Sequence, residues 1–180
     1  DRKKWLQSFD KNNILDSNLK DVSFNDFIEK EFKHFSNYDL IRSIPSICDG
    51  MKPSQRKVIY SCFKRNLTKE IKVAQLAGYV SEHSAYHHGE KSLCDAIVGL
   101  AQDYTGSNNI NLLHPSGQFG TRVMGGNDKA SPRYIHTFLG ELTRYIFRDE
   151  DAPILNYLND DGVQIEPEYF FPIILLCALA

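Results

Sequence analysis

The sequence contains few cysteines, and those present are far apart. Cys48, Cys62, Cys94 and Cys177 form no Cys-x-x-Cys pair, which argues against both a zinc-binding spacing and a short disulfide framework. Three of them have apolar neighbours, so we expect buried free thiols in a reducing compartment. A long apolar run is also missing, because the longest covers residues 173–180 and is far too short to span a bilayer.

Repeats, low-complexity segments and a signal peptide are absent as well. The chain starts without Met and stops inside its apolar run, so we expect it to be a portion of a longer protein. Its 180 residues, 42% hydrophobic and 24% charged, are typical of one soluble globular domain with attachments.

A strong net charge is lacking, but the formal value of −2 hides two halves of opposite sign. Residues 42–91 contain nine Lys or Arg against four Asp or Glu, whereas residues 141–168 contain two against eight. The basic half is therefore the candidate surface for a polyanionic partner. A solvated face without a partner explains the charge equally well.

Helices are predicted from apolar residues at helical spacing. One begins at Lys52-Pro53, because proline is tolerated in a first turn. Another covers about residues 72–81, and the strongest stripe runs from Leu93 to Tyr104. A helix over residues 22–35, capped by Ser23 or Asn25, has a stripe of phenylalanines that we interpret as packing.

The strongest helix has a basic beginning. His87, His88 and Lys91 lie beside backbone N–H groups that have no partner inside the helix, and such helix ends favour anions. We expect phosphate contact here. A metal site and structural histidines are the alternatives, although no Cys or carboxylate accompanies the pair at ligand spacing.

Strands are predicted after this helix. Residues 109–113 and 118–121 are predicted to pair around a turn at 115–117, and residues 133–138 form a further strand. Two helices, a turn and a third helix with a basic N-terminus describe a helix-turn-helix, and a β-ribbon that follows it is the wing of a winged helix. The predicted fold class is therefore α+β with a winged helix, followed by a helix over 139–147 with Leu139, Leu142 and Ile146 inward.

Residues 118–137, QFGTRVMGGNDKASPRYIHT, combine glycine-rich turns with an arginine next to a tyrosine. Glycine lets the main chain approach a ligand closely. Arg133 is a permanent cation whose fork matches phosphate oxygens, and Tyr134 can form a covalent intermediate when it is activated. We hypothesise that Tyr134 attacks a DNA phosphodiester while Arg133 stabilises the developing charge. The alternative is a surface charge beside a packed ring.

The chain also contains five specific strings: RSIPSICDGMKPSQRKV (42–58), KVAQLAGYVSEHSAYHHGE (72–90), GSNNINLLHPSGQFGTR (106–122), GGNDKASPRY (125–134) and EPEYFFPI (166–173). They resemble the winged-helix, DNA-cleaving domain of type IIA DNA topoisomerases. The eukaryotic, single-chain members are the better match, because the bacterial gyrase A protein has HPHGD where this chain has HHGE. The opening DRKKWL resembles the segment that follows the metal-binding TOPRIM domain.

The resemblance implies a role for each matching residue. Tyr134 corresponds to the nucleophile that forms a 5′-phosphotyrosyl bond, Arg133 to the transition-state stabiliser, and His88 to a group that shares the developing charge. Contacts to DNA or to the cleaved phosphate are implied for Lys52, Tyr86, His87 and Ser92, and for Arg42, Arg56 and Lys91.

The resemblance also implies an organisation. We expect a linker from the TOPRIM domain at residues 1–35, the winged-helix cleavage domain at 36–165, and the start of a tower domain at 166–180. The ending ILLCALA departs from the polar, glycine-rich segment usual in the family. Mg²⁺ ligands and the ATPase domain are expected outside this chain, with no metal site within it. The resemblance implies that the protein binds double-stranded DNA, forms a homodimer and makes no membrane contact. It also implies a nuclear location, or a cytoplasmic location if the protein comes from a virus that replicates in the cytoplasm.

Two other functions remain open from the residues. A tyrosine recombinase or type IB topoisomerase also uses Arg, His and Tyr, but none of the six histidines is followed by Arg in an H-x-x-R arrangement. A winged-helix DNA-binding module would need the basic helix and the wing but not Arg133 and Tyr134. Covalent capture of DNA separates the enzyme from this module.

Overall fold

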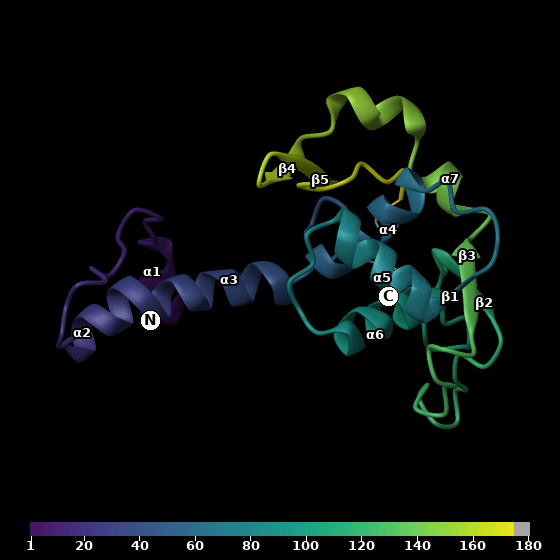
Figure 1. The fold of residues 1–180 in the computed structure, drawn as a ribbon, viewed down its shortest axis with the longest axis horizontal. Helices are drawn as coiled ribbons and strands as arrows, with labels where there is room; N and C mark the ends of the chain where they lie inside the picture. Colours follow the sequence, from purple (N-terminus) through teal and green to yellow (C-terminus); the bar gives the residue numbers. More distant parts are fainter. Residues whose placement is uncertain (175–180) are drawn as a thin grey trace. The chain divides into compact units, whose positions relative to one another are not determined.

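The computed structural model describes residues 1–174, which fall into two compact units, Asp1–Ile44 and a second unit that starts at Pro45 (Figure 1). The change of unit lies beyond residue 35, the expected end of the linker, because one helical run continues as far as Ser43. Each unit has its own set of contacts and is described separately.

The first unit consists of α1 (Arg2–Gln7) and a helical run made of α2 (Phe24–Phe27), a π-helical segment η1 (Ile28–Phe32) and α3 (Lys33–Ser43). Ser23 caps this run, because its hydroxyl oxygen accepts a hydrogen bond of 3.0 Å from the backbone N–H of Asp26. The predicted serine cap is therefore confirmed.

Trp5 attaches α1 to the helical run. Its indole N–H donates to Glu29 at 2.9 Å, and the ammonium of Lys33, which is 2.8 Å from the same carboxylate, lies over the Trp5 ring. The expectation that the phenylalanine stripe is packed is wrong for most of its members within this unit. Phe24 is 90% exposed and Phe35 is 58% exposed, because α1 is too short to cover the whole run.

The second unit places three helices beside a three-stranded antiparallel sheet (Figure 1). The helices are α4 (Pro53–Lys64), α5 (Val73–His83) and α6 (Glu90–Ala101), and the strands are β1 (Ile71–Lys72), β2 (Leu113–Ser116) and β3 (His136–Leu139). The mixed helix and sheet class is confirmed. The chain order helix, strand, helix, helix, strand, long loop, strand is the one that a winged helix requires.

The core of this unit lies where the three helices meet the sheet. Their inward residues are fully buried because each helix has an apolar stripe at helical spacing. The largest fully buried side chains include Val58, Ile59, Val73, Leu76, Val80, Leu93, Ile97, Leu113 and Ile135.

After β3 the chain forms α7 (Thr143–Ile146), a 3-10 helix η2 (Asp149–Ile154) and the antiparallel hairpin of β4 (Tyr157–Asp160) and β5 (Val163–Pro167). The predicted helix over 139–147 is wrong in its first half. Leu139 belongs to β3, and Leu142, predicted to point inward, is 55% exposed.

The predicted tight hairpin is also wrong. β2 begins at Leu113, and Pro115 and Ser116 belong to it instead of forming a turn. Its partner is β3, with Leu113 opposite Leu139 and Ser116 opposite His136. Residues 118–121 form no strand, so a long loop separates the two paired strands.

Candidate nucleophile and nucleic-acid interface

Arg133 and Tyr134 lie in a turn just before β3, and both are exposed. The turn is closed by a 2.9 Å hydrogen bond from the Tyr134 N–H to the carbonyl of Ser131. The Tyr134 side chain faces solvent, with the residue 77% exposed, whereas the next residue, Ile135, is only 1% exposed. The buried isoleucine fixes the backbone next to a tyrosine that remains accessible.

The first turn of α5 fixes this segment further. The N–H groups of Val73 and Ala74 have no partner within the helix, and they donate to the carbonyls of Ile135 (3.0 Å) and Pro132 (3.1 Å). These two carbonyls flank Arg133 and Tyr134. The helix terminus and the turn therefore satisfy each other, and the tyrosine is held on a rigid support.

The loop that leads to this turn is tightly folded by its glycines. A Cβ on Gly120 would lie 2.5 Å from Gly126 Cα, and a Cβ on Gly126 would lie 2.5 Å from Nε2 of Gln102. Both glycines have positive φ, 105° and 79°, where other residues are strained. Glycine was expected to bring main chain close to a ligand. In this structure the close approach is to the loop itself and to Gln102.

Asp128 holds the same loop through Thr121. Its carboxylate accepts hydrogen bonds of 2.8 Å from both the backbone N–H and the hydroxyl of Thr121. These bonds, the backbone one first, lower the pKa of Asp128 from its usual value because they favour the charged form. The charged aspartate thus stabilises the loop between β2 and β3.

The histidine segment, Tyr86–His88, for which phosphate contact is predicted, lies between α5 and α6. His87 and His88 are exposed, and Lys91 and Ser92 are exposed in the first turn of α6. The His88 ring meets the Tyr86 ring edge to face at 5.4 Å. Tyr86 is only 8% exposed and belongs to the core, so it supports the histidines more than it offers a face to DNA.

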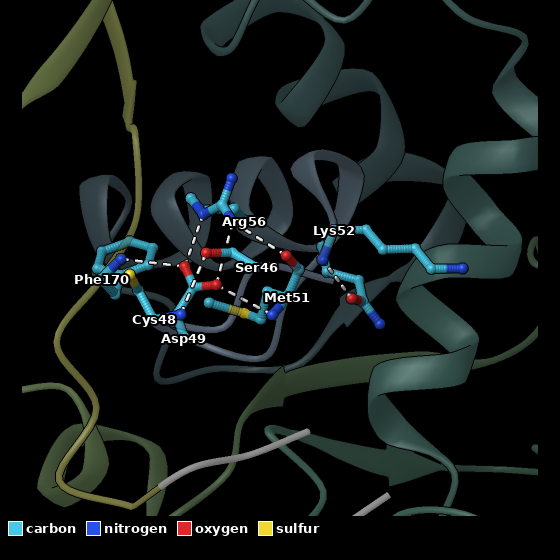
Figure 2. A network of polar contacts seen from close by, with 8 residues as sticks. Ser46, Cys48, Asp49, Met51, Lys52, Arg56 and Phe170 are labelled. Atoms are coloured by element: carbon cyan, nitrogen blue, oxygen red, sulfur yellow. Dashed lines mark hydrogen bonds and ion pairs between the residues drawn. The ribbon is translucent and has the colours of Figure 1, made fainter. Parts of the chain in front are cut away.

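Arg56 does not supply a free cation at the surface. It is 5% exposed, and its Nε and Nη2 lie 2.7 and 3.0 Å from the two oxygens of Asp49, which is fully buried. Figure 2 shows this carboxylate between the guanidinium and the backbone N–H groups of Met51 and Phe170, which both donate to it at 3.0 Å. The expected DNA contact of Arg56 is therefore not supported, and its role in this structure is structural.

The remaining predicted contacts are placed as follows. Lys52 precedes α4 as its N-cap, and its side chain points away from the Asp49 network in Figure 2. Arg42 lies in the last turn of α3, because only the residue directly before Pro45 is restricted to extended conformations. It belongs to the first unit and is paired with Asp39 at 2.9 Å.

The sequence interpretation missed a buried ion pair behind the histidine segment. Lys57 of α4 contacts Glu166 of β5, and its ammonium also donates to the carbonyl of Ser84. No local pattern indicates this contact, because the two residues are 109 positions apart in the sequence.

The thiols are placed differently from one another. Cys62 and Cys94 are buried, as expected, whereas Cys48 is exposed, and Cys177 lies outside the described residues. Complete burial raises the pKa of the Cys62 thiol to about 12.

Residues 1–174 contain neither a metal-binding cluster nor a membrane-spanning helix. In that range no group of three or more His, Cys, Asp or Glu side chains could hold a metal ion. None of the helices there has the length and apolar character needed to cross a membrane.

Comparison with known proteins gives concordant results. The family of DNA gyrase and topoisomerase IV A subunits matches residues 42–178, and the C-terminal associated domain of TOPRIM matches residues 1–40. DNA topoisomerase 2 of Plasmodium falciparum is 57% identical over 175 residues, and that of Saccharomyces cerevisiae is 55% identical over 174. Each alignment covers 97% of this chain but only 12% of the relative.

A solved structure shows the same fold. The crystal structure of the Plasmodium falciparum topoisomerase II DNA-binding, cleavage and re-ligation domain matches with a TM-score of 0.85 and 57% identity. The match covers 96% of this chain and 24% of that one.

Proposed function

The chain belongs to the family of DNA gyrase and topoisomerase IV A subunits, and we propose that it is the breakage-reunion segment of a longer type IIA DNA topoisomerase. In that protein it would make a transient double-strand break, through which a second duplex passes. The observation that carries this proposal is Tyr134, an exposed tyrosine in a turn that is pinned to the first turn of α5, with an exposed arginine beside it.

The proposed chemistry exchanges one phosphate ester for another. The Tyr134 oxygen attacks a backbone phosphorus, loses its proton and forms a new O–P bond to the 5′ phosphate. The bond from phosphorus to the 3′ oxygen breaks, and that oxygen leaves as a hydroxyl after it takes a proton. No water is consumed, so the same hydroxyl can later displace the tyrosine and reseal the strand.

Arg133 and His88 are proposed to stabilise this reaction. In phosphoryl transfer, positioning and charge stabilisation provide most of the catalysis. Arg133 is exposed in the turn before β3, so its guanidinium can meet phosphate oxygens. His88 would share the charge from the segment before α6.

The proposed DNA surface follows from exposure. Lys91, Ser92 and His87 lie at the start of α6 and are exposed, and this helix end favours phosphate. Lys52 and Arg42 are further proposed contacts. Arg56 is removed from the expected set because its charge is buried and paired with Asp49.

Other parts of the activity are proposed to lie outside this segment. The described residues do not fit a metal site, so we assign Mg²⁺ binding to the TOPRIM domain and no step here to the ion. ATP hydrolysis would likewise occur elsewhere in the protein. A homodimer would supply two tyrosines, one for each DNA strand. A nuclear location is part of the proposal because the relatives are eukaryotic.

The test is capture of the covalent intermediate. The complete protein is incubated with Mg²⁺ and end-labelled duplex DNA and quenched with denaturant. We expect an adduct through Tyr134 and the 5′ phosphate, lost in Tyr134→Phe and kept in Tyr145→Phe, which changes another exposed tyrosine, 72% exposed on α7. A 3′ linkage would indicate recombinase chemistry, and no adduct would leave a DNA-binding module.

A further inference from the structure

The backbone just before the two histidines adopts a strained conformation. Ala85 has φ of 47°, in the left-handed region that residues with a Cβ rarely adopt. Such a conformation persists only when its surroundings determine it strongly. The next residues are Tyr86, His87 and His88, so the conformation of Ala85 sets the direction in which the histidines leave α5.

Ser84 precedes Ala85 and is fully buried, and its N–H, hydroxyl and carbonyl groups all form hydrogen bonds. Its N–H and its hydroxyl both donate to the carbonyl of Val80, at 3.0 and 2.6 Å, and its own carbonyl accepts from the ammonium of Lys57. On the other side, the Tyr86 ring is 8% exposed and packs in the core. Ala85 is therefore held between two fixed neighbours.

Lys57 also forms an ion pair with Glu166. Its Nζ lies 2.9 Å from each carboxylate oxygen, and the side chains of the two residues are 14% and 3% exposed. The pair joins α4 to β5, and the same ammonium also donates to the carbonyl of Ser84. The same hairpin reaches the histidines a second time, because Asp160 of β4 lies 3.4 Å from Nε2 of His87.

We propose that Lys57 is a positioning residue for DNA cleavage, which acts through the Ser84 carbonyl to keep Ala85 left-handed and His88 in its place. This inference rests on the proposed function. Without a charged donor on Ser84, Ala85 relaxes toward an ordinary conformation and the histidines turn away from the phosphate. Small misplacements of this kind reduce the rate of a reaction strongly.

The experiment separates positioning from fold stability. Lys57→Met alone would leave the Glu166 carboxylate buried without its partner, which destabilises any protein. The variant tested is therefore Lys57→Met/Glu166→Gln, in which no charge is left unpaired but Ser84 still lacks its donor. The matched control is Glu166→Gln, in which Lys57 still contacts Ser84. Thermal unfolding of the complete protein verifies that both variants fold.

The measurement is the rate of Tyr134–DNA adduct formation by the complete protein with Mg²⁺ over a range of duplex concentrations. For the double variant we expect the rate at saturating DNA to fall roughly 10- to 100-fold, with little change in the half-saturating concentration. Glu166→Gln and Lys57→Arg, which both keep a charged donor, should stay within about threefold of the unaltered protein. Lys64 is on the same helix, and its ammonium lies over the Tyr60 ring. Lys64→Met should therefore form the adduct at the rate of the unaltered protein.

Equal saturating rates for the double variant and for Glu166→Gln would overturn the role of Lys57 while leaving the proposed function intact. Absence of any adduct from the unaltered protein would overturn both. If the double variant does not fold, Lys57→Gln/Glu166→Gln replaces it, with the same expected loss of rate. Ala85→Gly, added to the double variant Lys57→Met/Glu166→Gln, supplies a second measurement, because glycine adopts the left-handed conformation freely. It should recover at least about threefold, and no recovery would contradict the part played by strain.

Discussion

Asp49→Asn tests the buried network most directly, because it removes one charge without changing the shape of the side chain. The carboxylate accepts four hydrogen bonds, two from Arg56 and one each from the backbone N–H groups of Met51 and Phe170. An asparagine keeps one oxygen but places an N–H₂ group where the second oxygen accepted from Arg56 and Phe170. The variant therefore leaves a buried guanidinium without its counter-charge.

The size of the effect follows from burial. Removing one partner of a buried ion pair costs about 3–5 kcal/mol, which is a large part of the roughly 5–15 kcal/mol that stabilises a typical domain. With a urea m-value of about 2 kcal/mol per molar, the unfolding midpoint should fall by about 1.5–2.5 M. The slope m should not change.

The control is Asp149→Asn, which removes an exposed partner of Arg144. The two side chains are 3.1 Å apart, but Asp149 is 82% exposed, and such pairs contribute less than about 1 kcal/mol. Its midpoint should therefore shift by less than about 0.5 M. Urea unfolding of this chain, followed by far-UV circular dichroism, measures both variants.

A double variant determines whether the unpaired charge is the cause. Arg56→Met on the Asp49→Asn background should recover at least about 1 kcal/mol, because the guanidinium that lacked a partner is gone. If Asp49→Asn loses less than about 1 kcal/mol, or if the double variant is worse than the single one, the network does not hold the second unit together as argued.

Further predictions concern the loop, the thiols and the tyrosine. Asp128 has a lowered pKa, so its stabilisation is fully present above the unfolded value of about 3.9 and is lost as the pH falls through the lower folded value; Asp128→Asn should remove that acid dependence from the proteolysis rate of the loop. Gly120→Ala should make the same loop far easier to cleave even at neutral pH, because the new Cβ would meet Gly126 at 2.5 Å. A thiol reagent at pH 7 should modify Cys48 quickly and leave Cys62 unmodified until urea unfolds the chain, as mapped by mass spectrometry. Tyr134→Phe should keep DNA affinity within about twofold at fixed salt, because phosphate contacts dominate binding; a large loss in a fluorescence anisotropy titration would contradict a specialised nucleophile.

The helices were predictable because local physics determines them. α6 has an uninterrupted apolar stripe, and α4 begins at Pro53, where proline is favoured. The turn that contains Tyr134 is closed locally by its bond to Ser131, but its attachment to Val73 and Ala74 of α5 joins distant residues and could not be predicted from the local sequence.

The pairing of the strands was not predictable in the same way. The turn-like residues at 115–117 suggested a tight hairpin, yet Pro115 lies opposite Thr137 in β3. The outcome depends on a distant strand and on a loop whose own hydrogen bonds make it compact. Strand pairing of this kind is decided by tertiary contacts and not by local sequence.

The burial of the charged side chains Arg56 and Lys57 could not be predicted from the sequence either. Arg56 lies in a basic stretch that suggests a solvated or DNA-binding face, but its partner Asp49 lies in the turn before the helix, where helical periodicity does not apply. Lys57 pairs with Glu166 across most of the second unit. Only the folded chain shows that Arg56 faces Asp49 in the turn before α4, whereas the adjacent Lys57 faces Glu166 in the β4–β5 hairpin.

The attachment of the tyrosine turn to α5 has a consequence for how the protein is made. The bond from Val73 to Ile135 joins positions more than sixty residues apart, and closing such a loop costs about 3.7 kcal/mol of chain entropy. A chain that is still being synthesised cannot fix the turn until the residues up to Ile135 have left the ribosome, long after α5 has been made. The tyrosine is therefore positioned only after α4, α5 and α6 have been made, and a chain that ends before Ile135 does not present an ordered nucleophile to DNA.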